Sequence, residues 1–322
     1  MSRYPFTDAL NEFMPNELGH IASNTYETSR RRLAQIGKMF TQLKHEGIVS
    51  TDNPRRISAA DIDHFVGYRK SQGMKSSTIL KDLTLLKKML SYFDNDAVSA
   101  FKVKYPAHYP KRYIKRAPPM DDELVDRILA RAMEISIFDW KLMEAYGIVC
   151  LAICTGLRPK ELRMMYRNNL RLGEFSGEVY AVHVKGEDSY GSARWVPIHP
   201  DGILIMHRFL EARDLKLRTS GKMSEALFPP IRGKQTFIGY NMLEKLKKAV
   251  ETDIGESFDL RKCRRTFGQR ALDEGQDLYN VSLVLGHASL ATTQRYYCDK
   301  DQHTASEEMC EFWNRNAQTE DA

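Results

Sequence analysis

The residues best suited to chemistry lie close together near the end of the chain. Gly286 is placed to end one helix, His287 follows it, and a second short helix carries Tyr296 beside Tyr297. A phenol has an ordinary pKa of about 10, so it becomes a nucleophile when nearby cations or a base ease the loss of its proton. The same segment is also compatible with a structural histidine and two packed tyrosines. The functional interpretation therefore requires that other parts of the chain supply cations.

A first cation is predicted at a turn between two buried helices. Gly156 is placed to end a strongly apolar helix, Pro159 suits the first turn of the next helix, and Arg158 lies between them. A guanidinium is costly in such a place unless it meets an anion. That anion could be a phosphate, or it could be the carboxylate of Glu161.

Two further cations share one predicted helix. Leu260, Cys263 and Phe267 would form its apolar face, and this arrangement holds Arg261 and Arg264 three residues apart over one patch. Neighbouring guanidiniums repel each other, and a phosphate between them would remove that cost.

A lysine accompanies the one clear β element that the sequence predicts. Two strand-like runs, 178–184 and 193–198, flank a turn rich in glycine, and Lys185 lies where the first run enters the turn. Pro197 suits an edge strand or a strand end. A lysine at a hairpin is ordinarily a solvated charge.

The wording of these segments resembles that of the tyrosine recombinase (phage integrase) family. Four stretches carry the resemblance, in the family's order: TGLRPKEL at 155–162, VKG followed by R.VPI around the hairpin, R..R.TF at 261–267, and LGH followed by TT..Y at 285–296. The resemblance extends from about Asn24 to Tyr297. It implies that a tyrosine attacks a DNA phosphate held by cations, with these catalytic residues: Arg158, Lys185, Arg261, Arg264, His287 and Tyr296.

The resemblance also assigns roles. Arg158 and Arg264 would clamp the phosphate, and Glu161 would support the first of them. Lys185 would protonate the departing oxygen, and His287 would stabilise the transition state and accept the proton of the nucleophile.

Two positions are less straightforward. Most members of the family have histidine or lysine where this chain has Arg261, and an arginine can donate hydrogen bonds but cannot accept a proton at ordinary pH. Tyr297 is the rival nucleophile, and the interval from His287 favours Tyr296.

The predicted fold is mainly α, because the chain is long enough for two cores and its apolar residues recur at helical spacing. The resemblance identifies the first core as a SAM-like helical domain that clamps DNA, and the second as a mostly helical catalytic domain with a small β hairpin. We expect five segments: an extension at 1–23, the DNA-binding domain at 24–101, a basic linker at 102–119, the catalytic domain at 120–300 and a C-terminal tail or helix at 301–322.

The N-terminal half of the sequence contains several predicted helix starts and two clusters of basic residues. Asn24 or Thr25 is expected to cap the first helix of the DNA-binding domain, Ser58 forms a capping box with Asp61, and Ser76 or Ser77 caps a later helix. The triple arginine at 30–32 and the basic, tyrosine-dotted linker are suited to a phosphate backbone. Solvated surface charge and an ordinary basic linker are the alternatives.

Composition limits the other classes of function. A net charge of +6 makes a polyanion plausible as a partner, and five cysteines without a CxxC pair argue against zinc and against a disulfide framework. We expect no metal and no cofactor, because no carboxylate cluster suited to magnesium appears. No apolar run reaches the roughly 20 residues of a membrane span, and no signal peptide is evident, so we expect a cytoplasmic, nucleoid-associated protein with no membrane partner.

The resemblance thus predicts a site-specific DNA recombinase that acts through a covalent 3′-phosphotyrosine in integration, excision or dimer resolution. Its partner would be double-stranded DNA, with a homotetramer on two DNA sites. A catalytically impaired DNA-binding accessory protein of the same fold is the alternative, and Arg261 is the feature that favours it. A related enzyme that only relaxes supercoils is a third possibility.

Overall fold

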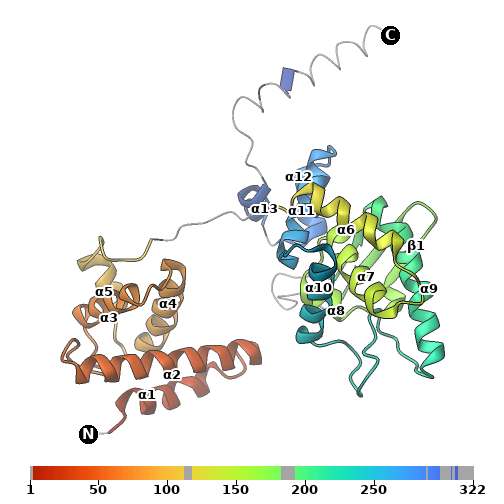
Figure 1. Cartoon of the computed structure of the whole chain (residues 1–322). Coiled ribbons are helices and arrows are strands. Elements are labelled where there is room, and N and C mark those ends of the chain that lie inside the picture. The colour runs from red at the N-terminus through yellow and green to blue at the C-terminus, as the bar shows by residue number, and fades with distance from the viewer. Residues whose placement is uncertain are drawn as a thin grey trace. The chain divides into compact units, whose positions relative to one another are not determined.

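The computed structural model describes residues 3–111, 118–182, 193–287, 289–297, 306 and 309–310. The chain divides into two compact units, Met1–Lys115 and Arg116–Ala322 (Figure 1). Both are built mostly of helices, and the second also contains a small antiparallel sheet. The mainly α fold with a small β element is therefore confirmed. Within the described ranges, no helix has the length and apolar character needed to cross a membrane.

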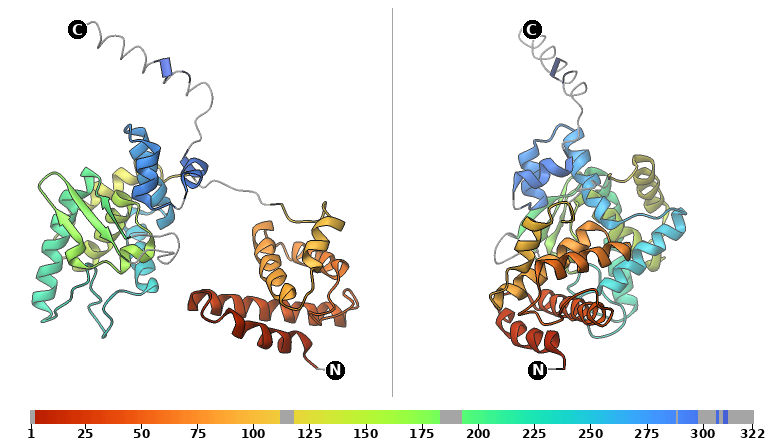
Figure 2. Two further views of the ribbon diagram at one scale, coloured as in Figure 1. Left: turned by 180° about the vertical axis from the view of Figure 1, so that it is seen from behind. Right: turned by 90° about the vertical axis from the view of Figure 1, so that its left-hand side faces the viewer.

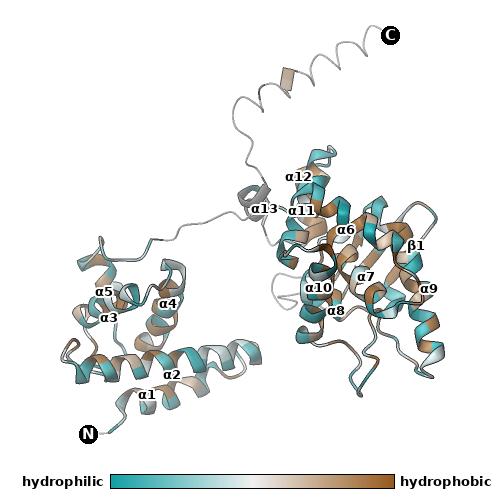
Figure 3. Cartoon of the chain, in the orientation of Figure 1, coloured by the Kyte–Doolittle hydropathy of each residue, from teal (hydrophilic) through white to brown (hydrophobic). Residues whose placement is uncertain are grey.

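The first unit is helical throughout its described part and has its own apolar core. Its helices are α1 (Pro5–Phe13), α2 (Ser23–His45), α3 (Ala59–Ser71), α4 (Ser76–Tyr92) and α5 (Ala97–Lys104), with a 3₁₀ turn η1 at Met14–Glu17. Most helices in Figure 3 are partly teal and partly brown, as expected when one face of a helix packs into a core.

Helix starts in this unit only partly follow the sequence signals. The capping box of Ser58 and Asp61 opens α3, as predicted. The other predicted caps are wrong, because α2 starts after Ala22 and α4 after Lys75 without a side-chain cap. The buried faces of these helices, not a capping side chain, determine where they lie.

The segment expected only as an extension contains helix α1, which packs into the core. Phe6, Leu10 and Phe13 are buried, and the ring of Phe6 lies so close to α2 that a Cβ at Gly37 would come within 2.5 Å of it. Glycine at position 37 is therefore what admits this contact.

Part of the triple arginine has a structural role. Asp82 is buried in the first unit, and its carboxylate pairs with Arg32 at 2.5 Å and with Arg69 at 2.8 Å. Arg30 and Arg31 are exposed. The phosphate interpretation of this cluster can therefore apply only to the latter two side chains.

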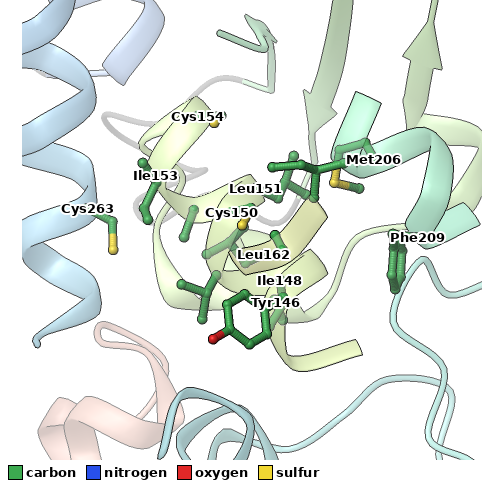
Figure 4. Close-up of a cluster of buried hydrophobic side chains, with 14 of the residues drawn as sticks. Tyr146, Ile148, Cys150, Leu151, Ile153, Cys154, Leu162, Met206, Phe209 and Cys263 are labelled. Carbon is green, nitrogen blue, oxygen red and sulfur yellow. The ribbon is translucent and has the colours of Figure 1, made fainter. Parts of the chain in front are cut away.

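The second unit is built around one apolar helix, α7 (Trp140–Thr155), which lies at its centre. Its helices are α6 (Asp122–Glu134), α7 (Trp140–Thr155), α8 (Pro159–Arg163), α9 (Ile203–Thr219), α10 (Tyr240–Ile254), α11 (Leu260–Asp273), α12 (Leu278–Leu285) and α13 (Leu290–Tyr297), with 3₁₀ turns η2 (Arg167–Asn169) and η3 (Pro200–Gly202). Every residue of α7 from Met143 to Thr155 is buried. Figure 4 shows α7 between α11, which carries Cys263, and α9, which carries Met206 and Phe209.

In the described ranges the sheet has three strands, one more than the hairpin that the sequence predicts. β1 (Leu170–Leu172), β2 (Gly177–Ala181) and β3 (Arg194–Pro197) pair antiparallel in that order, and the left view of Figure 2 shows them. β1 has only three residues, too few for an alternating pattern to be recognised. Val179 pairs with Val196 and both are buried, so Arg194, two residues before Val196, also lies on the inner face.

Candidate active site

Arg158 projects from the junction of α7 and α8. Gly156 ends α7 in the left-handed conformation, with φ of +62°, and Arg158 then forms the N-cap position of α8. Its Nη1 donates to Glu161 Oε1 at 3.0 Å, and its Nη2 donates to the carbonyl oxygen of Gly286 at 3.1 Å. The pairing with Glu161 is therefore present, yet 29% of the Arg158 side chain stays accessible to an external anion.

Arg264 reaches the same place from α11. Its Nη1 donates to the carbonyl oxygen of Gly156 at 2.9 Å, and its Nη2 donates to that of Leu285. Gly156 is the C-cap residue of α7 and Leu285 is the last residue of α12, so Arg264 joins two helix ends. Arg158, whose contact is Gly286, lies at the same junction.

A third guanidinium, from Arg194, completes this arrangement. Its Nε donates to the carbonyl oxygen of Val284 at 2.6 Å, and its two Nη atoms donate to the two carboxylate oxygens of Glu161 at 3.3 Å each. Sequence reasoning gave Arg194 no role. Its only sequence signal is its position in the R.VPI motif. Its contacts form because the inner face of a strand packs against a helix that is distant in sequence.

Three neighbouring guanidiniums would repel one another without compensation. The side chain of Glu161 is 1% exposed and pairs with both Arg158 and Arg194. The C-terminal carbonyls of α7 and α12 supply further negative charge, since the C-terminus is the negative end of a helix dipole. Burial alone would raise the pKa of Glu161, but Arg194, Arg158 and their hydrogen bonds outweigh it, so that its pKa lies below the ordinary value.

His287 follows directly after this junction. Gly286 ends α12 with φ of +64°, the backbone N–H of His287 donates to the carbonyl of Ser282 at 3.0 Å, and its Nδ1 lies 2.7 Å from Thr293 Oγ1. Burial lowers the pKa of His287 to about 4, and the charges of Arg264, Arg158 and Arg194 act in the same direction. The imidazole is therefore neutral at pH 7.

Arg261 differs from the other predicted cations in its surroundings. It lies one turn before Arg264 on α11, its side chain is exposed, and its backbone N–H donates to Asp259 at 2.9 Å. Tyr240 has a raised pKa, chiefly through its hydrogen bond to Glu244, and the charge of Arg261 opposes that shift. None of the contacts given above for Arg158, Arg264 and His287 involves Arg261.

The structure leaves two predicted residues incompletely described. Lys185 lies outside the described residues. Tyr296 falls within α13, which packs against α12 and α11, but its side chain is outside the description. Thr293 of α13 is fully buried and contacts His287, so α13 is attached to the site three residues before position 296. The sequence carried this threonine in the TT..Y wording but assigned it no contact.

No group of three or more histidine, cysteine, aspartate or glutamate side chains that could hold a metal ion occurs in the described ranges. The described part of the site brings fixed cationic donors beside a neutral imidazole.

The chain is similar in sequence to characterised proteins. Residues 120–303 match the phage integrase family. The chain is 29% identical over 303 residues to the tyrosine recombinase XerD of Pseudomonas aeruginosa, covering 91% of this chain and 92% of that protein. It is 26% identical over 297 residues to the tyrosine recombinase XerC of Escherichia coli O157:H7, covering 87% and 91% respectively.

Solved structures share the fold. The XerH site-specific recombinase bound to its difH substrate, in a pre-cleavage complex, superposes with a TM-score of 0.67 at 16% identity, covering 96% of this chain and 90% of that one. The integrase of transposon Tn1549 in complex with a circular intermediate DNA gives a TM-score of 0.67 at 16% identity, covering 96% and 99%.

Proposed function

Because the chain belongs to the phage integrase family, whose members are tyrosine recombinases, we propose that it is a site-specific DNA recombinase that works through a covalent 3′-phosphotyrosine. The observation that supports this most is the junction of α7, α11 and α12, where Arg158, Arg264 and a neutral His287 converge. A phosphodiester resists attack because it is anionic and its leaving group is poor, so catalysis requires fixed positive charge, a nucleophile and a proton donor.

The two arginines supply the fixed charge. A guanidinium has five N–H donors, and the contacts of Arg158 described above use two of them, so its accessible part can bind a non-bridging phosphate oxygen. Arg264 binds the other oxygen. Arg261, exposed near by on α11, acts as a donor to the DNA and takes no part in proton transfer.

The neutral imidazole suits proton transfer from the nucleophile. Tyr296 Oη attacks the phosphorus, and His287 accepts the phenolic proton. The bond from phosphorus to the 5′ oxygen breaks, and that oxygen takes a proton from Lys185. The products are a 3′-phosphotyrosine and a free 5′ hydroxyl. The 5′ hydroxyl of another strand then reverses the step, and rejoining consumes neither ATP nor metal.

The same proposal covers partners and location. The substrate is double-stranded DNA, and two relatives of similar fold were solved with DNA bound. Four protomers act on two DNA sites, and the protein works in the cytoplasm at the nucleoid. Arg30, Arg31 and the basic linker contact the phosphate backbone, which makes affinity strongly salt-dependent.

A nicked substrate tests this proposal. The DNA would be selected by the protein from a randomised duplex pool and nicked near the cleavage position, so that a short strand is lost after attack. We expect a covalent protein–DNA species with the wild type and none with Tyr296→Phe, while Tyr297→Phe retains it.

Other outcomes identify the alternatives. Specific binding without any covalent species would support an accessory DNA-binding protein. With plasmids that carry two selected sites, recombinant products support the proposal, whereas relaxed topoisomers alone would indicate an enzyme that does not exchange partners.

A further inference from the structure

We propose that Arg194 is a positioning residue. By connecting Glu161 to the end of α12, it fixes the position of the phosphate-binding Arg158 relative to the imidazole of His287. This inference rests on the proposed function of the same site. It assigns Arg194 no contact with the scissile phosphate.

Each nitrogen of the Arg194 guanidinium has a partner in the protein. Nε donates to Val284, and the two Nη atoms form a fork on Glu161, which also binds Arg158. Only 11% of its side chain is exposed, against 29% for Arg158. The guanidinium of Arg194 is thus directed into the protein, whereas that of Arg158 remains accessible to an anion.

The guanidinium also packs against the backbone just before His287. A Cβ at Gly286 would lie 2.9 Å from Cζ of Arg194, closer than side-chain atoms ordinarily approach. Glycine at position 286 therefore serves two needs, the left-handed φ of +64° and the space for this side chain. Displacement of Arg194 would move the backbone that carries the imidazole.

Because Arg194 lies on β3, its contacts connect this strand to α8 and α12. Arg194 begins β3, opposite Ala181 of β2, and these residues flank the segment 183–192 in which Lys185 lies. β3 packs against α12. The side chain of Arg194 therefore connects β3, the first turn of α8 and the end of α12.

The charge of Arg194 affects the pKa of His287, and this pKa is a quantity that a purely structural role of Arg194 would not change. Among the described residues, the charged groups that act on His287 are Arg264 from α11, Arg158 from the N-cap of α8 and Arg194 from β3, while its neighbour on α13, Thr293, is uncharged. All three arginines disfavour the imidazolium. Removing the charge of Arg194 should therefore raise the pKa of His287, and replacing it with another cation should not.

The test compares Arg194→Met with Arg194→Lys in the full chain. Three quantities are measured: single-turnover cleavage of the nicked duplex, affinity for the same DNA, and the pKa of His287 from the NMR titration of its ring, assigned with His287→Gln. Arg171→Met is the matched control, because Arg171 lies on the same sheet, pairs with Glu178 at 3.1 Å and is not among the groups that act on His287.

We expect Arg194→Met to slow cleavage on the order of 100-fold, the loss that a misplacement of about 1 Å can cause, with DNA affinity changed less than about threefold. The pKa of His287 should rise in this variant. Arg194→Lys should keep the pKa near that of the wild type and still cleave slowly, because an ammonium cannot bridge Glu161 and Val284 as the planar fork does.

Wild-type cleavage by a folded Arg194→Met or by Arg194→Lys would overturn the inference. If Arg194→Met does not fold, Arg194→Lys decides alone, with slow cleavage at unchanged DNA affinity as the expected result. The two proposals fail differently: a wild-type protein that never forms the covalent species refutes the proposed function, whereas an active wild type with active Arg194 variants refutes only the positioning role.

Discussion

At the scale of single residues, the charge balance of the site depends on one buried carboxylate. Glu161 is 1% exposed and pairs with both Arg158 and Arg194, so it compensates two of the three guanidiniums at the helix junction. Removing one member of a buried ion pair leaves the other charge uncompensated, which is far more damaging than losing an exposed pair.

We therefore expect Glu161→Gln to lower the free energy of unfolding by about 3 kcal/mol. Glu178→Gln, which breaks the exposed pair with Arg171, should cost under about 1 kcal/mol. Denaturant unfolding monitored by circular dichroism measures both. Equal losses in the two variants would show that Glu161 does not compensate the arginines. The pKa of Glu161 is lowered, so its contribution should be present above the ordinary carboxyl pKa and lost as pH falls below it.

The sequence indicated most of these residues but not their contacts. Arg158 had two open interpretations, and the structure contains the pair with Glu161 while leaving part of the side chain accessible. Arg194 could not be singled out, because a strand residue acquires its partners only when the sheet meets α12. Arg261 was expected beside Arg264, but spacing along a helix does not specify which of two neighbours a distant segment will contact.

At the scale of elements, the site is a meeting of helix ends. Left-handed glycines end α7 and α12, and the guanidiniums of Arg264, Arg158 and Arg194 bind the carbonyls exposed there. These terminal carbonyls have no partner within their own helices, so the arginines satisfy them and gain from the negative ends of the helix dipoles. The Gly156 end was predicted from its glycine and the proline that follows.

The close approach at Gly286 gives a prediction with a matched control. Gly286→Ala and Gly255→Ala each place a Cβ at a left-handed position, at a cost of about 1 kcal/mol in stability. Position 255 has open space, whereas position 286 meets the guanidinium of Arg194. Gly286→Ala should lose cleavage of the nicked duplex by at least about tenfold, and Gly255→Ala should retain it. Equal cleavage by both variants would contradict the role of this contact.

Elements with weak local signals were the ones the sequence missed. β1 has three residues, and its pairing with β2 defines it more than its composition does. Helix α1 was included in an extension, although its apolar face packs into the first core. Elements with a strong apolar periodicity or a clear start or stop signal, such as α3 with its capping box, were predicted from local residues alone.

At the scale of the whole molecule, the two units have separate apolar cores: one cluster of buried side chains lies in Met1–Lys115, and a large cluster and a small one lie in Arg116–Ala322. A change confined to one core should therefore affect one unfolding transition. Glu144 is suited to this test. It is buried in α7 of the second unit, and its Oε1 has no hydrogen-bond partner among the described residues.

Burial raises the pKa of Glu144 to about 8, and the charge of Lys216 opposes this only in part. The folded state therefore keeps the proton that the unfolded state loses near pH 4.5, so stability falls as pH rises from that value toward 8. Glu144→Gln removes this dependence and should raise the melting temperature of the second unit much more at pH 8 than at pH 5. Calorimetry at both values measures it, and an unchanged slope with pH would exclude a buried neutral Glu144.

In the proposed mechanism, Tyr296 becomes linked to DNA at the junction of Arg158, Arg264 and His287. Trypsin should release the peptide Tyr296-Tyr297-Cys298-Asp299-Lys300 from the covalent complex, because Arg295 precedes it and Lys300 ends it. Mass spectrometry of that peptide, after nuclease digestion of the attached strand, locates the phosphate on one of its two tyrosines. We expect phosphate on Tyr296 and an unmodified Tyr297. Phosphate on Tyr297, or on a peptide from another part of the chain, would contradict that mechanism.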